Sequence, residues 1–215
     1  LVNLVPNFYS ATKGQVLIDG VNADEYDRAA LLSAVSVVPQ KAVLFEGTIR
    51  SNLLMGNPNA SEAELFAALE TAQAAEIVRT KPNGIDEPVL RGGSNFSGGQ
   101  KQRLSIARAL VHGGRILILD DSASALDFAT DAKLRAAIRK LSPAPTTFIV
   151  SQRAASVMFA DFIIVLDEGR AVGQGTHEEL LRNCAVYREI YASQFPDEAA
   201  KLSLPNNTPE GDAAK

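Results

Sequence analysis

Length, composition and charge exclude several classes of protein. The chain has 215 residues, of which 46% are hydrophobic and 21% are charged, values typical of a globular protein and not of a disordered or collagen-like chain. At roughly 150 residues per domain, this length fits one domain with a second lobe or a tail. The longest apolar stretches, such as 162–166, are far shorter than the roughly 20 residues of a membrane-spanning helix.

Charge and cysteine content bear on the partners of the protein and on the compartment in which it works. The chain carries 21 Lys and Arg residues against 25 Asp and Glu residues, so its net charge of −4 favours no general surface for nucleic acid. The single cysteine, Cys184, cannot form an internal disulfide, which fits a reducing compartment. The sequence begins at Leu1 without a Met, a basic leader or a helix cap, so we interpret it as the C-terminal part of a longer protein.

Strand and helix patterns alternate along most of the chain. Short apolar or alternating runs predict strands at 15–19, 35–38, 116–119 and 147–150, and a hairpin at 162–172. Helical spacing predicts helices at 26–32, 100–111 and 130–141, and a last helix after Thr176, with Glu179 completing its capping box. The alternation of buried strands with helices predicts an α/β fold with a mostly parallel sheet.

The two ends and one internal segment differ from this pattern. Residues 1–5 have the spacing expected at the end of an amphipathic helix. Residues 48 to about 85 are rich in Ala, Leu and Glu without a strand pattern, which predicts a helical insertion containing a capping box at Ser61 and Glu64. We expect one domain over 1–196, with its helical part at about 48–112, and a disordered tail over 197–215.

A pair of carboxylates follows the most apolar predicted strand. Ile116-Leu-Ile-Leu119 leads directly into Asp120 and Asp121. A buried strand that delivers Asp at its carboxyl end is how P-loop nucleotidases hold Mg²⁺. The alternative is that an Asp caps the next helix, and the motif alone leaves both readings open.

A glycine-rich turn opens the predicted helix at 100–111. In Asn95-Phe-Ser97-Gly98-Gly99-Gln100, the glycines allow the backbone to approach an anion, and a helix N-terminus supplies N–H groups and a favourable dipole. Ser97 as a simple helix cap is the alternative reading. The motif gains weight because Lys101-Gln-Arg-Leu-Ser-Ile-Ala-Arg-Ala-Leu and then the Asp pair follow it.

With these motifs in this order, the sequence resembles the nucleotide-binding domain of exporter-type ATP-binding cassette (ABC) transporters. The matching motifs are Gln40 after Val37-Val-Pro (Q-loop), Phe96-Ser-Gly-Gly-Gln100 (signature), Leu117-Ile-Leu-Asp120 (Walker B) and Ser124-Ala-Leu-Asp127 (D-loop). Stretches 45–53 and 175–180 are also similar to exporter-type members, and the resemblance runs from Leu1 to about Ser193. It implies a P-loop NTPase-like (RecA-like) core, an α-helical signature subdomain and an antiparallel β edge.

The resemblance also implies roles for individual residues. Asp120 and Gln40 would bind the Mg²⁺ that accompanies ATP, and Asp121, Gln152 and Gln40 would form the catalytic side of the site. The residues implied to contact ATP on the partner domain, or to lie at the interface with it, are Ser97, Gly98, Gly99, Gln100, Ser124, Ala125 and Asp127. The P-loop motif G-x-x-x-x-G-K-[ST] occurs nowhere in the sequence, and Leu1 falls where that loop ends in the family.

Two residues depart from the family pattern. The usual catalytic Glu after the Walker B Asp is Asp121, whose carboxylate lies about 1.5 Å further back. The usual switch histidine is Gln152, whose amide can donate a hydrogen bond but cannot carry charge or relay a proton. This resembles the subunit of heterodimeric exporters that carries the degenerate site, so we predict slow turnover here and a signature motif that completes the partner's competent site.

The resemblance implies partners and a cellular location, and alternative functions remain open. The expected partners are a second nucleotide-binding domain, most simply a different subunit, and an N-terminal transmembrane domain outside this sequence, at the cytoplasmic face of the plasma membrane; no nucleic acid is expected. The alternatives are a non-catalytic interaction or regulatory module and a soluble ABC ATPase. His177 is expected at the surface, His112 is expected to favour its helix dipole, and Cys184 to be a packing residue in the last helix.

Overall fold

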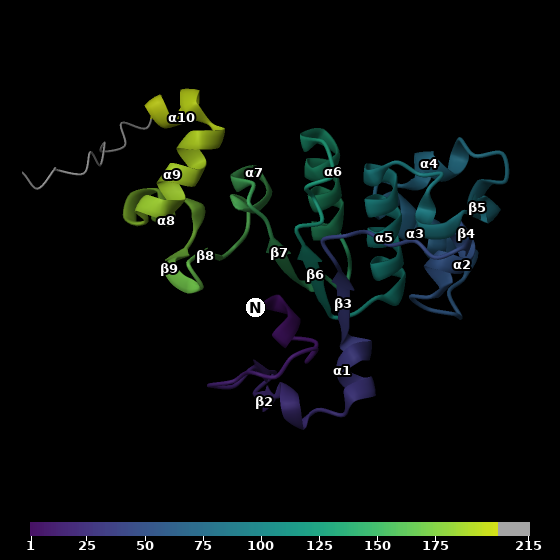
Figure 1. The fold of residues 1–215 in the computed structure, drawn as a ribbon, viewed down its shortest axis with the longest axis horizontal. Coiled ribbons are helices and arrows are strands. Elements are labelled where there is room, and N and C mark those ends of the chain that lie inside the picture. The colour runs from purple at the N-terminus through teal and green to yellow at the C-terminus, as the bar shows by residue number, and fades with distance from the viewer. Residues whose placement is uncertain (202–215) are drawn as a thin grey trace, which may run out of the picture. The chain divides into compact units, whose positions relative to one another are not determined.

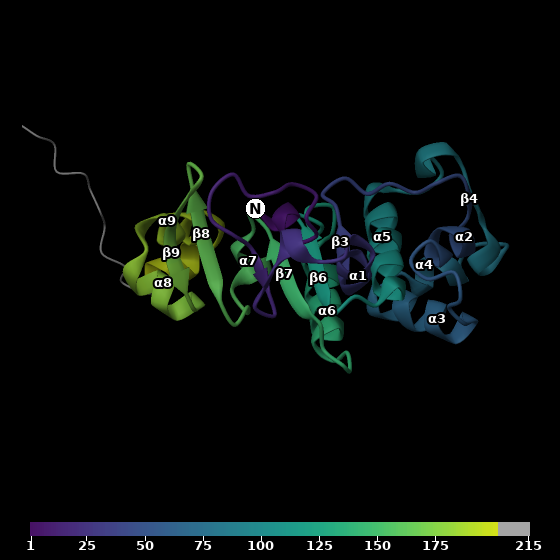
Figure 2. The same cartoon turned by 90° about the horizontal axis from the view of Figure 1, so that it is seen from below.

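The computed structural model describes residues 1–201 and divides the chain into two compact units, residues 1–152 and the residues from Arg153 onward. The centre of the first unit is a parallel sheet of β3 (Val35–Val38), β6 (Ile116–Asp120) and β7 (Thr146–Val150), with β6 in the middle. Each strand follows a helix: α1 (Arg28–Ala34), α5 (Gly98–His112) and α6 (Phe128–Arg139) (Figure 1 and Figure 2). The predicted α/β fold with a parallel sheet is confirmed.

The register of this sheet aligns the carboxyl ends of its strands. Val38 lies opposite Leu119, and Asp120 lies opposite Val150. Because parallel strands end at the same edge, the residues that follow β3, β6 and β7 gather there. Leu117, Ile118 and Leu119 are buried, as expected for a central strand of a parallel sheet.

Residues 47–93 form the helical part of the first unit. It contains α2 (Ile49–Leu54), α3 (Glu62–Thr71), α4 (Ala75–Arg79) and the 3₁₀ turns η3 (Gly84–Asp86) and η4 (Arg91–Gly93). The predicted capping box at Ser61 and Glu64 is present at the start of α3. One detail was not predicted: β4 (Gly47–Thr48) pairs antiparallel with β5 (Pro88–Val89), so a two-stranded ladder closes the helical insertion.

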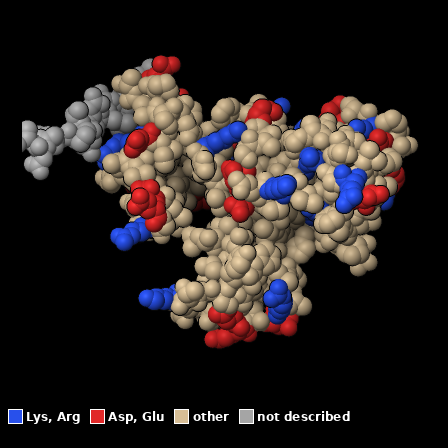
Figure 3. Space-filling view, viewed as in Figure 1, with Lys and Arg blue, Asp and Glu red and all other residues tan. Residues whose placement is uncertain are grey.

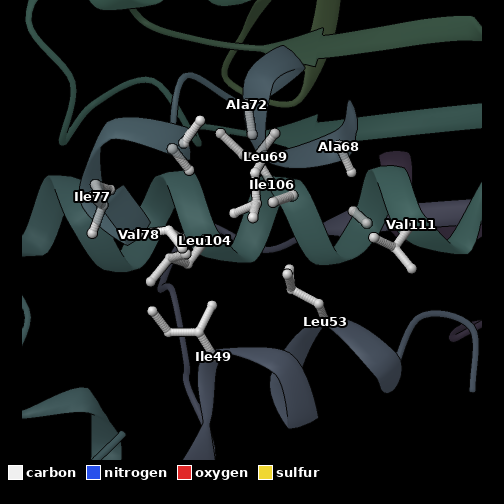
Figure 4. Packing of buried hydrophobic residues seen from close by; sticks show 14 of the residues in the cluster. Ile49, Leu53, Ala68, Leu69, Ala72, Ile77, Val78, Leu104, Ile106 and Val111 are labelled. Carbon is white, nitrogen blue, oxygen red and sulfur yellow. The ribbon is translucent and has the colours of Figure 1, made fainter. Parts of the chain in front are cut away.

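The main hydrophobic core lies around α5. Leu69 of α3 and Ile106 of α5 are fully buried and lie close together, while Ile49 and Leu53 of α2 approach α5 from another side (Figure 4). Buried apolar residues recur on these helices at helical spacing, as Ile49 and Leu53 do on α2. Gly113 ends α5 in the left-handed conformation, with φ of 71°, which glycine adopts without the steric strain of a Cβ atom.

The first residues of the chain are less regular than predicted. Leu1–Val5 contain only a 3₁₀ turn, η1 (Val2–Leu4). The strand expected at 15–19 is reduced to β1 (Leu17–Ile18), which pairs antiparallel with β2 (Val21–Asn22) and is followed by η2 (Ala23–Glu25). The turn between the two strands uses Asp19 and Gly20, both with positive φ, a local pattern that predicts a hairpin better than a single strand.

The second unit combines a hairpin with helices. It contains α7 (Ala154–Val157), the antiparallel strands β8 (Ile163–Asp167) and β9 (Arg170–Gly175), and the helices α8 (His177–Asn183), α9 (Ala185–Gln194) and α10 (Pro196–Lys201). The hairpin and the Thr176 capping box are confirmed. The prediction of a single last helix is wrong, because the chain turns at the buried Cys184 between α8 and α9. The first five residues of the predicted tail are in α10, and the rest lie outside the described residues.

His177, which was expected at the surface, is only partly exposed. It is half-buried, its Nδ1 lies 2.8 Å from the Tyr187 hydroxyl, and its ring centroid lies 5.2 Å from that of Tyr191. The packing of α8 against α9 encloses it, which local sequence does not reveal. His112 does lie in the last turn of α5, as expected, and its Nδ1 is 3.0 Å from the Ser36 hydroxyl.

No helix within residues 1–201 combines the length and apolar character required to cross a bilayer. On the face shown in Figure 3, basic and acidic side chains are interspersed.

Candidate functional site

The carboxyl edge of the parallel sheet brings Gln40 and Asp121 together. Gln40 is the second residue after β3 and Asp121 the first after β6, so the strand register sets them side by side although they are 81 positions apart. The Gln40 side-chain Nε2 donates a hydrogen bond of 3.1 Å to Asp121 Oδ2. Two of the three residues predicted to form the catalytic side are therefore in direct contact.

Asp121 has an unusual backbone conformation that its neighbours hold. Its φ is 46°, in the left-handed region, which Asp and Asn tolerate better than most residues. Its backbone N–H donates to the Val150 carbonyl oxygen at 2.9 Å. Its own carbonyl oxygen accepts hydrogen bonds from the Ser124 backbone N–H at 3.2 Å and from the Ser124 hydroxyl at 2.8 Å. The residue is therefore fixed between the end of β7 and the D-loop.

Asp120 lies one residue earlier, at the end of β6, and is half-buried. Its carboxylate makes no hydrogen bond or ion pair with another residue of the described part of the chain. The same residues contain no group of three or more His, Cys, Asp or Glu side chains that could hold a metal by themselves. This donor set fits Mg²⁺, which usually binds one or two protein oxygens and takes its other ligands from water and phosphate.

Gln152 lies at the same edge of the sheet, two residues beyond the end of β7, and is exposed. The carboxyl ends of β3, β6 and β7 thus carry Gln40, the Asp pair and Gln152 in that order across the sheet. This is the edge at which open α/β sheets bind ligands. The four residues predicted for the Walker side of the site are positioned by three strands, while their chemical roles remain predictions.

The second cluster of predicted residues is at the start of α5. Ser97 caps the helix: its hydroxyl accepts the Gln100 backbone N–H at 3.3 Å, and the Gln100 side chain accepts the Ser97 backbone N–H at 3.0 Å. The capping reading of Ser97 is therefore confirmed. Ser97 and Gly98 are also exposed, so the first turn of a 15-residue helix offers backbone N–H groups to solvent, a position that suits an anion.

The signature turn packs against the D-loop. A Cβ atom placed on Gly99 would lie 3.0 Å from the Ala125 carbonyl oxygen. Ser124 and Ala125 are exposed, and Asp127 caps α6 by accepting the Thr130 backbone N–H at 2.9 Å. Hydrogen bonds from the backbone N–H and the hydroxyl of Thr130 lower the pKa of Asp127, because they stabilise its charged form. Signature and D-loop thus form one continuous surface.

Two arginines of α5 that no sequence motif indicates tie this helix to other segments of the first unit. Arg103 of α5 donates from Nη1 to the Gln73 carbonyl oxygen at 2.7 Å and from Nε to the Gly99 carbonyl oxygen at 3.4 Å. Arg108 donates from Nη2 to the Val43 carbonyl oxygen at 3.0 Å. Burial lowers the pKa of Arg108 because its charged form loses hydration. Helical periodicity alone offered no signal that would set these arginines apart from solvated ones.

A further residue outside the predictions, Asn52 of α2, fixes the segment after the Q-loop. It is buried, accepts the Phe45 backbone N–H at 2.8 Å, and donates to the carbonyl oxygens of Phe45 and Thr48 at 2.8 and 2.9 Å. A polar residue within the apolar pattern of a helix is the one signal in the sequence that could have indicated it.

The known proteins that this chain resembles belong to one family. A profile described as "ABC transporter" matches residues 1–124. An uncharacterized ABC transporter ATP-binding protein of Mycobacterium tuberculosis is 45% identical over 197 residues, which are 90% of this chain and 34% of that protein. The ATP-dependent lipid A-core flippase of Burkholderia orbicola is 41% identical over 200 residues, 93% of this chain and 34% of the flippase.

A solved structure gives the same result for the fold. A bacterial Atm1-family ABC exporter with ATP bound superposes with a TM-score of 0.86 at 38% identity, over 90% of this chain and 34% of that chain. The chain spans about a third of the length of the curated relatives it matches. Because the family profile covers more than half of the chain, the chain belongs to the ABC transporter family.

Proposed function

We propose that this chain is part of the ATP-binding half of an ABC exporter and hydrolyses ATP when complete and paired. The contact between Gln40 and Asp121 beside Asp120, at the carboxyl edge of a parallel sheet, carries the proposal. It is supported by the names of two relatives, an ATP-dependent lipid A-core flippase and a putative multidrug export ATP-binding/permease protein of Staphylococcus aureus. A transmembrane domain preceding this chain, and a position at the cytoplasmic face of the plasma membrane, are parts of the same proposal.

The edge of the sheet supports a further strand and a P-loop outside this sequence. Within the described residues, β7 pairs only with β6, and Phe148 and Val150 are 40% and 38% exposed. Strands of parallel sheets are normally buried on both faces, so a neighbouring element is expected to cover them. In the proposal, this element leads to the phosphate-binding loop that the sequence lacks.

In this proposal, different residues at the site bind the cation and act on the γ-phosphate. Asp120 and Gln40 would hold Mg²⁺, which when bound neutralises phosphate charge and orients the phosphate groups. In this proposal, Asp121 and Gln152 would stand where the family activates water and contacts the γ-phosphate. Because Asp121 is one methylene shorter than Glu and Gln152 cannot carry charge, we propose that this site binds ATP and turns it over slowly.

The signature turn serves a different nucleotide in this proposal. Ser97, Gly98, Gly99 and Gln100 keep the family motif, and the exposed first turn of α5 would accept the γ-phosphate of ATP held by a partner domain. Ser124, Ala125 and Asp127 would contact that partner. An intact signature beside an altered Walker side suggests a partner with its own competent residues, and therefore a heterodimer.

The test is the ATPase activity of the full-length protein co-expressed with its partner subunit. Asp121→Ala should barely lower the activity, because this site contributes little turnover. Ser97→Arg and Gly98→Asp should abolish it, because each places a side chain where the partner's γ-phosphate would bind. Ser33→Arg, at an exposed serine of α1, is the matched control and should leave the activity unchanged.

The reverse outcome would identify the alternatives. If Asp121→Ala abolishes activity, this subunit carries the working site and the degenerate assignment is wrong. If neither signature variant affects a partner's activity, the chain is better described as a non-catalytic interaction module. Full activity of the complete protein without any membrane-embedded domain would favour a soluble ABC ATPase.

A further inference from the structure

The hydrogen bond between Gln40 and Asp121 has only one possible direction. An ionised carboxylate can only accept hydrogen bonds, so the amide must present its N–H₂ group to Asp121. The distance of 3.1 Å between Nε2 and Oδ2 fits this arrangement. The amide oxygen of Gln40, Oε1, is then the end turned away from that contact, and it has no hydrogen-bond partner among residues 1–201.

Asp121 is the fixed member of the pair. Its backbone is held by the Val150 carbonyl oxygen on one side and by Ser124 on the other. Gln40 is exposed and follows Pro39 in the loop after β3, and within residues 1–201 its side chain makes no hydrogen bond other than the one to Asp121. The orientation of the Gln40 amide therefore depends on the Asp121 carboxylate.

We propose that Asp121 is a positioning residue that selects which end of the Gln40 amide faces the divalent cation of bound nucleotide. With Nε2 held by Asp121, Gln40 presents Oε1, and oxygen is the atom that Mg²⁺ binds. With the amide reversed, it would present N–H groups, which cannot bind a cation. The inference rests on the proposed function, since it assigns Asp121 a task within the proposed ATP site.

This role gives a reason for a carboxylate at position 121 even if the site turns over ATP slowly. An Asp at this position is too short to serve as an effective base, yet it reaches Gln40. Its φ of 46° is also better tolerated by Asp than by Glu, so the backbone here suits the shorter acid. A carboxylate that orients a ligand group for a metal is a common second layer of metal sites.

The substitution Asp121→Asn isolates this role. Asn has the size of Asp and equally tolerates the left-handed conformation, so the fold is maintained. Its side chain can both donate and accept, however, so it bonds to either end of the Gln40 amide and no longer selects one. The two orientations of Gln40 then compete, and the affinity for the cation falls.

The experiment uses the full-length protein with its partner subunit, and measures binding instead of turnover. Photo-crosslinking with 8-azido-ATP reports each subunit separately, in Mg²⁺ and in EDTA. The readout is the ratio of the two dissociation constants for this subunit. Asp121→Asn should reduce the benefit of Mg²⁺ about tenfold, the lower end of what loss of such an orienting group costs. Asp121→Glu, which keeps a carboxylate, should lose much less.

Two further variants complete the test. Gln40→Ala should reduce the ratio as Asp121→Asn does, and the double variant should be no worse than Gln40→Ala, because both changes remove the same interaction. Asp19→Asn is the matched control: it removes a carboxylate at an exposed residue with φ of 49° and should change nothing.

The outcomes separate this inference from the proposed function. If the wild-type subunit takes up no nucleotide in either condition, the proposed function fails and the inference fails with it. If it binds ATP with the expected benefit of Mg²⁺ but Asp121→Asn retains that benefit, the inference alone is overturned. Additive losses in the double variant would also overturn it, since they would show that Asp121 and Gln40 act independently.

Discussion

Gly99 at the start of α5 and Ala125 in the D-loop approach so closely that a Cβ atom on Gly99 would lie 3.0 Å from the Ala125 carbonyl oxygen. The neighbouring backbone is held in place, because Leu126 N–H donates to the Ala123 carbonyl oxygen at 2.9 Å and Ser124 bonds to Asp121. Gly99 is therefore required for packing, independently of any contact with nucleotide.

The first prediction compares the two glycines of this turn. Gly99→Ala should lower the free energy of unfolding by about 1 kcal/mol, because the D-loop must shift to admit the methyl group. At Gly98 a Cβ atom would meet nothing within 4 Å, so Gly98→Ala should be neutral or stabilise the helix by about 0.5 kcal/mol. Urea unfolding of the two variants measures the difference, and equal stabilities would contradict the packing role.

The second prediction concerns Asn52, which saturates three backbone groups of Phe45 and Thr48. Asn52→Ala leaves these groups without their partner in a buried place, and should cost about 2–3 kcal/mol of unfolding free energy. Asn59→Ala, at an exposed residue nearby, is the control and should cost less than about 0.5 kcal/mol. A loss as small as that of the control would show that water satisfies the groups.

The third prediction is a pH dependence from His177. Burial lowers the pKa of His177 below its usual value near 6.5, although Glu178 and Glu198 oppose this shift. The folded state thus favours the neutral ring, so the stabilisation is complete above pH 6.5 and is lost as the pH falls through the folded pKa. His177→Gln should remove this part of the dependence, measured as the wild-type minus variant difference in urea midpoint between about pH 5 and 8. A difference that does not change with pH would refute it.

The fourth prediction tests the contact of α10 with α9. The Tyr191 hydroxyl donates to Glu198 Oε2 at 2.6 Å, which, with burial, raises the pKa of Tyr191 to about 12. The contribution to stability is present below the usual pKa near 10 and is lost as the pH rises toward about 12. Glu198→Gln should return the tyrosinate absorbance transition toward pH 10, and Asp197→Asn, at an exposed neighbour, should not. An unchanged transition in Glu198→Gln would exclude the contact.

Much of this fold could be predicted from the sequence because the signals are local. The capping boxes at Ser61 and Thr176 involve residues three positions apart, and both are present. The apolar run at 116–119 indicates a buried parallel strand because its composition alone excludes an exposed one. The order of the motifs along the chain is also a local signal, and it indicates the ABC family without any contact between elements.

Only the tertiary structure decided how these parts meet. The bond between Gln40 and Asp121 joins residues 81 positions apart, and it exists because β3 and β6 are aligned in register. The enclosure of His177 by Tyr187 and Tyr191 depends on the packing of α8 against α9. Local sequence determines the capping hydrogen bonds within one element, whereas the burial of a residue such as His177 and the contacts between elements depend on register and packing, which no short stretch of residues specifies.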